Sequence, residues 1–357
     1  MIYLDYNASV PLRPQAKDAM LAAFEREGNP SSPHGAGRKV RALIDEARKE
    51  ILDETHADRV VFTSGGTEAN ALALSGLGSI PVVVSAIEHD SVLKATPNPH
   101  IIPVTPEGSI DLEALEKTLD SIEKPGLVSV MLVNNETGVI QPIEKVACIT
   151  QLKGWKLHTD ASQAIGYVPL DFDKLGVDLM TLSSHKCGGP VGIGAILMKD
   201  GIHLEPMIKG GGQEYGMRSG TLSAPLILGF IAAFKAALNE KIKDFQQKIE
   251  TAFPSAIVYG KDSPRAPEVT CLGMPGVLNE LQIMAFDIEG IAISAGSACS
   301  SGKMKTSHVL AAMGISPEEA KCAIRVSFGW KTQDSDINAF IEAWNRIYDS
   351  QKLKDAS

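Results

Sequence analysis

Apolar residues in the first two thirds of the chain alternate between short continuous runs and helical spacings. Runs rich in β-branched residues predict buried strands at 60–62, 82–84, 128–133, 156–158, 179–182 and 195–198. Between them, apolar residues over 112–122 and 143–150 recur every three or four positions, which predicts amphipathic helices. This alternation predicts an α/β domain with a largely parallel sheet that helices cover on both faces.

The last third of the chain has a different pattern. A helical spacing over about 225–251 is followed by a strand near Ile257, a helix over 280–286, a strand over Ala323–Ser327 and a final helix from about Asp336. Because helices and strands no longer alternate regularly, the pattern predicts a second, smaller α+β domain. The long helix would form the hinge between the two domains.

The composition of the chain limits which kinds of molecule it can bind. The 357 residues carry a net charge of −9 without a cluster of lysine or arginine, which argues against a nucleic-acid surface. The five cysteines never form C-x-x-C, so we expect neither a disulfide framework nor a bound metal. The apolar run at 224–234 is too short to span a bilayer, and the first residues do not resemble a signal peptide. We therefore expect a cytoplasmic protein without membrane attachment that acts on a small molecule.

An unusual polar group follows most of the predicted strands. The first strand runs into "TSGGTEAN", a glycine turn that opens a helix near Thr67, where free backbone N–H groups and the helix dipole form an anion site. The carboxyl ends of parallel strands meet at one edge of a sheet, where ligands bind. The other strand ends bring His89, Asn134, Asn135, Asp160, Gln163, Ser183, His185 and Lys186 to this edge.

Each of these groups, taken singly, has an ordinary structural explanation. A lysine in a glycine-rich loop is generally solvated, and an aspartate after a strand is generally a helix N-cap. Together they form the set that pyridoxal phosphate requires: a helix N-terminus for its phosphate, Lys186 for its aldehyde, Asp160 for its ring nitrogen and His89 for its ring face. The motifs of dinucleotide-binding, P-loop and zinc-protease sites are not found in the sequence.

Over about residues 3–330 the chain resembles the cysteine desulfurases of the NifS/IscS type. The stretches that carry the resemblance are "YLDYNASVPLRP", "GNPSSPHGAGRKV", "FTSGGTEANALAL", "VNNETGVIQPI", "HTDASQAIG", "SSHKCGGPVGIG", "GGGQEYGMRSGT", "SAGSACSSG" and "IRVSFG". The resemblance implies a homodimeric, class V aminotransferase-like transferase of pyridoxal-phosphate fold type I. Such an enzyme takes sulfur from L-cysteine, leaves L-alanine, and passes the sulfur to a protein acceptor such as an iron–sulfur scaffold or a sulfur carrier.

The same resemblance implies a large domain with a mostly parallel seven-stranded sheet and a smaller α+β C-terminal domain. We place the large domain at residues 15–245 and the small one at residues 1–14 and 246–357. Cofactor roles are implied for Lys186 as covalent anchor, Asp160 at the ring nitrogen, Gln163 at the ring hydroxyl, His89 on the ring face, Gly66, Thr67, Ser183 and His185 at the phosphate, and Thr221 at the phosphate of the partner subunit.

For the substrate, the resemblance implies that Arg325 clamps the carboxylate and that Asn135 and Asn7 lie beside it. Cys299 would be the nucleophile, with Lys186 and His89 as the other catalytic groups. The stretch "SAGSACSSGKMKTSH" around Cys299 has few apolar side chains to pack, so we expect an exposed, mobile loop over about 297–306.

The other cysteines have other expected environments. Cys148 and Cys322 lie in apolar-periodic segments and are expected in the core, whereas Cys187, beside Lys186, is ambiguous from sequence alone.

Two alternative functions share part of this pattern. An aminotransferase or a selenocysteine lyase of the same fold would use Lys186 and Asp160, but it would not need a loop thiol, so Cys299 favours the desulfurase. A non-enzymatic scaffold for sulfur assembly would be expected to have lost Lys186, Asp160 or His89, and all three are present.

Overall fold

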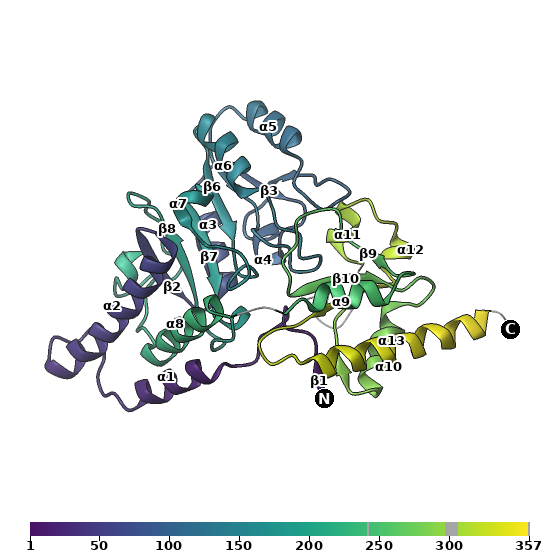
Figure 1. Ribbon diagram of the computed structural model, residues 1–357. Coiled ribbons are helices and arrows are strands. Elements are labelled where there is room, and N and C mark those ends of the chain that lie inside the picture. Colours follow the sequence, from purple (N-terminus) through teal and green to yellow (C-terminus); the bar gives the residue numbers. More distant parts are fainter. Residues whose placement is uncertain (241–242, 297–305, 356–357) are drawn as a thin grey trace.

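The architecture consists of a central sheet wrapped by helices and a second, smaller sheet beside it (Figure 1). The structure is a computed structural model, and it describes residues 1–240, 243–296 and 306–355. Cys299 and most of the loop expected at 297–306 therefore lie outside the described residues. Among the described residues, no helix is both long and apolar enough to cross a membrane.

The central sheet has seven strands and is mostly parallel, as the resemblance implies. In spatial order the strands are β2 (Arg59–Thr63), β8 (Gly194–Met198), β7 (Leu179–Ser183), β6 (Lys156–Asp160), β5 (Leu127–Ser129), β3 (Val82–Ser85) and β4 (His100–Ile102). β8 is antiparallel to its neighbours β2 and β7, and the other neighbouring pairs are parallel. β2, β7, β6, β5 and β3 consequently end at the same edge.

The strands of this sheet are apolar on both faces because helices cover both. In β2, Val60 and Phe62 are buried in one core with α2 (Gly35–Thr55) and α8 (Ala224–Leu238), while Val61 is buried in another core with α3 (Gly66–Ser75). Successive side chains of a strand point to opposite faces, so a strand covered on both sides shows a continuous apolar run. The other helices of this part are α1 (Pro14–Phe24), α4 (Asp90–Leu93), α5 (Leu112–Ser121), α6 (Ile143–Leu152) and α7 (Phe172–Leu175).

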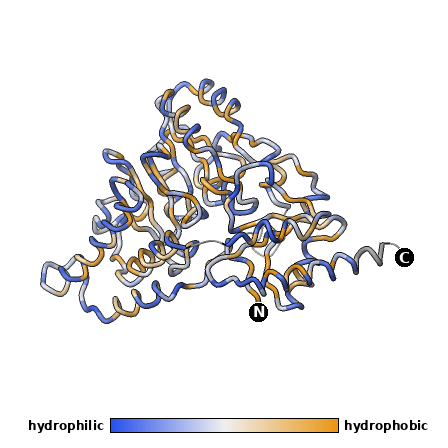
Figure 2. Tube along the Cα trace, viewed as in Figure 1, coloured by the Kyte–Doolittle hydropathy of each residue, from blue (hydrophilic) through white to orange (hydrophobic). Residues whose placement is uncertain are grey.

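Figure 2 shows hydrophobic residues concentrated inside the molecule and hydrophilic residues along the outer turns and loops.

The smaller sheet is antiparallel, in the order β12 (Ala323–Ser327), β10 (Val269–Gly273) and β9 (Ile257–Val258). β1 (Ile2–Tyr3) and β11 (Ile291–Ala292) form a short parallel pair. The helices of this part are α9 (Phe245–Ala252), α10 (Asn279–Ile288), α11 (His308–Ala312), α12 (Pro317–Ala320) and α13 (Asp334–Asp355).

Aromatic side chains fill the core beneath the smaller sheet. Phe286 stacks on Phe340 with ring centroids 5.0 Å apart, and Phe253 stacks on Trp344 at 4.5 Å. Such pairs add a specific geometry to the burial of large apolar surfaces. The same core buries Ile324 and Val326 of β12, and it therefore holds the strand that carries Arg325.

The long helix expected over 225–251 is instead two helices, α8 and α9. α8 ends where Asn239 forms its C-cap, and α9 begins where the Asp244 side chain accepts a hydrogen bond from the backbone N–H of Gln247 at 3.1 Å. Asparagine and aspartate favour helix ends because their short side chains bond nearby backbone groups. The spacing of apolar residues hid this interruption, so the prediction of one hinge helix was wrong.

Three further expectations need correction. The strand expected over 128–133 is β5, which ends at Ser129, although Val130 and Leu132 still donate backbone hydrogen bonds to His158 and Asp160 of β6. Cys148 is exposed, because the buried stripe of α6 runs through positions 143, 146, 147 and 150 and leaves position 148 outside. Cys322 is partly exposed, between α12 and β12.

Candidate active site

A cavity of about 470 Å3 lies at the edge where the parallel strands end. Most of the residues that the sequence analysis predicted for the active site line it: Asn7, Gly66, Thr67, His89, Asn135, Asp160, Gln163, Ser183, His185, Lys186 and Arg325. Thr221 is exposed and does not line this cavity in the single chain, and Cys299 lies outside the described residues. The topology therefore brings together residues that are up to 318 positions apart, from Asn7 to Arg325.

Lys186 is held by the backbone of the N-terminal segment. It lies at the end of a 3-10 turn, η1 (Ser184–Lys186), directly after β7. Its Nζ donates hydrogen bonds to the carbonyl oxygens of Asn7 at 2.5 Å and Ala8 at 3.1 Å. Gln163 Nε2 donates to the same Asn7 carbonyl at 3.0 Å. These carbonyl acceptors hold the amine in place, and Lys186 lines the cavity.

Residues 7–13 form what we call the N-terminal strap, which runs along the lysine turn. Val10 N–H donates to the His185 carbonyl at 2.9 Å, and Arg13 N–H donates to the Gly188 carbonyl at 2.8 Å. Arg13 Nε also donates to the Cys187 carbonyl at 2.8 Å. Gly188 has a left-handed φ of 84°, and a Cβ there would lie 2.7 Å from Arg13 Cγ. Glycine is thus needed at position 188 for both conformation and space.

A chain of hydrogen bonds connects the carboxylate of Asp160 to the ring of His89. Asn70 Nδ2 donates to Asp160 Oδ2 at 2.7 Å and to Ser91 Oγ at 2.9 Å. Ser91 Oγ lies 2.7 Å from His89 Nδ1, and the Ser91 N–H donates to the same nitrogen at 3.1 Å. Asp160 Oδ1 accepts from the Ser162 N–H at 2.9 Å. These bonds orient a carboxylate and an imidazole at the same cavity.

The start of α3 forms an anion cup. No side chain within the described residues caps this helix, and Gly66 and Thr67 of its first turn line the cavity. The first N–H groups of a helix have no acceptor within it, so they are available to a ligand there. A Cβ at Gly66 would lie 3.4 Å from the hydroxyl oxygens of Ser162 and Ser183, so the glycine leaves open the space between those hydroxyls and the helix. Unpaired N–H groups, a helix dipole and two hydroxyls are the donors that a phosphate group accepts from.

Glu68, in the first turn of α3, is a carboxylate that is paired with Arg218. Arg218 Nε donates to its carboxylate at 2.9 Å, and the Ser64 N–H donates at 2.6 Å. Burial alone would raise the pKa of Glu68, but these hydrogen bonds and the charge of Arg218 outweigh it and lower the pKa. The pairing also holds Arg218 of the "RSGT" stretch beside the helix start.

Two histidines near the site are neutral at pH 7. Burial, together with the charge of Lys186, lowers the pKa of His185 to about 4. Burial also lowers the pKa of His158 to about 4, although the charge of Asp160 opposes the shift. His158 lies between Ser129 Oγ at 2.8 Å and Thr181 Oγ1 at 3.0 Å, so it serves as a neutral link between strands. Lys186 is therefore the cationic side chain that η1 presents to the cavity.

Arg325 brings a second cationic group, from the smaller sheet. One of its terminal nitrogens donates to Asp5 Oδ1 at 2.8 Å and the other donates to the Asn135 carbonyl at 3.0 Å. Its Nε is buried without a hydrogen-bond partner in the described structure. A buried arginine donor without a partner is costly, and an anionic ligand would satisfy it.

Sequence reasoning missed Asn70, Ser91, Ser162 and most of the strap. Asn70 did carry a signal, because a polar residue interrupts the apolar run "ANALAL" on a helix that lies against the sheet. Ser91 and Ser162 have no such signal, since serine two residues after a strand-end group is common in turns. The strap acts through backbone groups, whose partners the pattern of side chains does not reveal.

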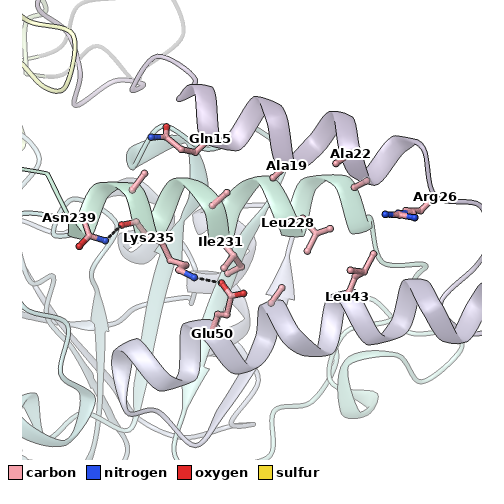
Figure 3. A pocket seen from close by; sticks show the side chains of 14 residues that line it. Gln15, Ala19, Ala22, Arg26, Leu43, Glu50, Leu228, Ile231, Lys235 and Asn239 are labelled. Atoms are coloured by element: carbon pink, nitrogen blue, oxygen red, sulfur yellow. Dashed lines mark hydrogen bonds and ion pairs between the residues drawn. The ribbon is translucent and has the colours of Figure 1, made fainter.

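A second hollow lies elsewhere, between α1, α2 and α8, with a volume of about 530 Å3 (Figure 3). Its walls are mostly alanine, leucine and isoleucine side chains, and Lys235 pairs with Glu50 across it at 2.9 Å. It contains none of the groups that the sequence analysis assigned to the reaction. Those groups gather instead around the cavity at the strand ends.

Comparisons with known proteins give one consistent family. The family described as aminotransferase class-V matches residues 2–340. The cysteine desulfurase IscS of Dictyoglomus turgidum is 36% identical, covering 100% of this chain and 96% of that protein. The solved structure of a NifS-like protein from Rickettsia africae has a TM-score of 0.91 at 35% identity, covering 98% of this chain and 99% of that one. A structure described as SspA in complex with cysteine has a TM-score of 0.81 at 30% identity, covering 92% and 99%.

Replacing Asn70 tests the bond network. Asn70→Ala removes the 2.7 Å bond to Asp160 and leaves a buried carboxylate oxygen without that donor, which should lower the free energy of unfolding by about 1–3 kcal/mol. Urea denaturation of the cofactor-free protein measures this loss. Asn239→Ala, at the exposed end of α8, is the matched control and should change the value by less than about 0.5 kcal/mol. Equal stability of the two variants would show that the network contributes nothing.

The reactivity of Cys187 tests the burial of its environment. Burial raises the pKa of this thiol to about 12, and its Sγ lies 3.2 Å from the Ser184 carbonyl oxygen. Since the thiolate is the reactive form, iodoacetamide should not label Cys187 in the folded protein between pH 7 and 9, whereas exposed Cys148 should be labelled. Peptide mass spectrometry, with urea-unfolded protein as the positive control, measures both. Labelling of Cys187 at the rate of Cys148 contradicts the account.

Proposed function

The chain belongs to the aminotransferase class-V family, and on that premise we propose that it is a cysteine desulfurase that works with pyridoxal phosphate. The reaction takes sulfur from L-cysteine, releases L-alanine and leaves a persulfide on Cys299. The observation that carries the proposal is a single cavity that holds Lys186, Asp160 and an uncapped helix start together with Arg325. Likeness over the full chain to proteins named cysteine desulfurase supports the same reaction.

The side chains of the cavity fit this cofactor. The open cup at Gly66 matches a phosphate, and Lys186 offers a positioned amine for an aldehyde. The residues that would hold the group are Gly66, Thr67, Ser183 and His185 at the phosphate, Asp160 at the ring nitrogen, Gln163 at the ring hydroxyl, His89 at the ring face and Lys186 at the aldehyde carbon. When bound, pyridoxal phosphate withdraws electrons from the α-carbon of an amino acid and makes its proton acidic.

Arg325 would bind the carboxylate of the substrate. Its planar fork suits a carboxylate, and its buried Nε is available for one in the described structure. Asn135, whose carbonyl already accepts from Arg325, would lie beside the substrate, and Asn7, which donates to the same carbonyl at 3.2 Å, would orient it. The substrate amino group would then face Lys186 across the cavity.

Lys186 and His89 would move the protons. Nζ of Lys186 would take the proton from the substrate α-carbon, and the carbonyls of Asn7 and Ala8 would stabilise the resulting ammonium while it holds that proton. His89 would take the proton of the substrate thiol, and the hydrogen bond that its ring accepts from the Ser91 N–H fixes the orientation of the imidazole. A fixed base in reach of the proton it takes is the main requirement of general base catalysis.

Cys299 would supply the nucleophile. Its thiolate would attack the substrate sulfur, and the carbon–sulfur bond would break with its electron pair remaining on carbon, where protons complete alanine. The new persulfide would then pass its outer sulfur to a protein acceptor, an iron–sulfur scaffold or a sulfur carrier. Cytoplasmic location is part of the same proposal, since this chemistry needs reduced thiols.

We further propose a homodimer in which Thr221 of one subunit reaches the phosphate held by the other. Thr221 is exposed in the single chain, so a second subunit can bury it. Arg218, three residues earlier, is tied to Glu68 in the first turn of α3. That tie fixes the start of the "RSGT" stretch on its own subunit, and exposed Thr221 would reach from there to the other subunit.

Mass spectrometry after a single exposure to L-cysteine tests the proposed reaction. We expect one additional sulfur on the peptide that contains Cys299 and an equal amount of alanine. Cys299→Ser should still show the absorbance change that L-cysteine induces but should lose persulfide and at least about a hundredfold in turnover, because no other thiolate can replace a positioned nucleophile. Cys148→Ser is the control and should retain wild-type turnover. Full activity of Cys299→Ser contradicts the assignment of the nucleophile.

A further inference from the structure

The buried carboxyl group of Glu136 has no part in the reaction derived above. Glu136 follows Asn135 in the "NNETG" turn and is almost completely buried, with 2% of its surface exposed. Burial raises its pKa, while a hydrogen bond from Ser307 and the charges of His308 and Arg325 oppose the rise. Burying a carboxyl group is costly unless it makes strong contacts, so its contacts indicate what it does.

The contacts of Glu136 lie on both sides of the segment that carries Cys299. Ser307 Oγ donates a hydrogen bond to Glu136 Oε2 at 2.5 Å, and Ser307 lies just after residues 297–305. Gly296 lies just before them, and a Cβ at Gly296 would lie only 2.1 Å from the same Oε2. Gly296 therefore packs directly on the carboxyl group, which no other residue type could do without displacing it. One oxygen atom thus touches both ends of the segment.

The turn that carries Glu136 is itself firmly held. Asn134 Oδ1 accepts hydrogen bonds from the N–H groups of Glu136 and Thr137, both at 3.0 Å. The next residue back, Asn135, lines the cavity and binds Arg325 through its carbonyl oxygen. The same turn therefore faces the substrate site with Asn135 and the two segment ends with Glu136.

Both segment ends are also fixed on their other sides. Ser294, two residues before Gly296, exchanges backbone hydrogen bonds with Arg325 at 3.2 and 2.6 Å. Ser307 is the N-cap of α11 and accepts from the Leu310 N–H at 3.1 Å. Glu136 thus contacts both of these anchored ends directly from the turn beside the cavity.

We propose that Glu136 is a positioning residue for the sulfur-transfer step, because it fixes where the segment with Cys299 leaves and rejoins the fold relative to the cavity. This inference rests on the proposed function, since it concerns the step at Cys299. Substrate binding and removal of the α-proton use other side chains, so they should not depend on Glu136. A displacement of about 1 Å in a reacting group can cost on the order of a hundredfold in rate.

The test separates the two halves of the reaction in the cofactor-loaded enzyme. Glu136→Gln should keep the L-cysteine-induced absorbance change and its concentration dependence within about twofold of wild type, and slow persulfide formation on Cys299 by about tenfold or more in single-turnover mass spectrometry. Ser307→Ala, which removes the partner, should slow the same step. The double variant should be no slower than the slower single variant, because both remove one interaction.

Two control variants separate the proposed effect from the general effects of changing a buried carboxyl group or removing a helix N-cap. Glu268→Gln alters another fully buried carboxyl group, whose oxygens have no partner in the described structure, and Ser316→Ala removes another helix N-cap, that of α12. Both should form persulfide at a rate within about twofold of wild type. If Glu136→Gln does not fold, the Ser307→Ala comparison decides the question alone.

The outcomes separate this inference from the proposed function. Persulfide formation at the wild-type rate in Glu136→Gln and Ser307→Ala overturns the inference, as does an equal loss of the absorbance change and persulfide formation. A wild-type enzyme that forms alanine without a persulfide on Cys299 instead overturns the proposed nucleophile, and the inference falls with it.

Discussion

The backbone carbonyl of Asn7 is the point on which the assembly of the site depends. It accepts hydrogen bonds from Lys186, which comes from the end of β7, and from Gln163, which follows β6. The N–H of the same residue donates to Ser327 Oγ in β12 at 2.9 Å, and its side chain reaches the Asn135 carbonyl. A single residue near the start of the chain therefore joins the strand ends of the large sheet to the smaller sheet, and the site exists only when all three parts have folded.

Electrostatics follow from this arrangement. The site collects two cations, Lys186 and Arg325, whose nitrogens donate to backbone carbonyl oxygens and, for Arg325, to the carboxylate of Asp5. His185 and His158 stay neutral because burial penalises their charged forms. The cavity is therefore suited to a ligand that carries phosphate and carboxylate groups, and the uncapped start of α3 reinforces that preference.

The sequence was sufficient to predict the sheet and most of the site, for identifiable reasons. β2, β6, β7 and β8 are buried on both faces, so their apolar runs are continuous and easy to recognise. Because β6 and β7 are parallel, Asp160 at the end of one and Lys186 after the end of the other lie at the same edge of the sheet. The sequence did not predict features that depend on backbone groups or on single polar residues. The strap acts through carbonyls, Asn239 and Asp244 interrupt an apolar spacing, and the stripe of α6 excludes Cys148 although its neighbours are buried. Thr221 could not be placed from one chain, because its proposed ligand lies in a second subunit.

The most direct test of the account is where the cofactor attaches. The protein loaded with pyridoxal phosphate should be reduced with borohydride, digested, and its peptides weighed by mass spectrometry. The account predicts that the cofactor is fixed on the peptide that contains Lys186, because this amine is the one that the strap and η1 aim into the cavity. Attachment to another lysine, or bound cofactor without any modified lysine, would contradict the central claim.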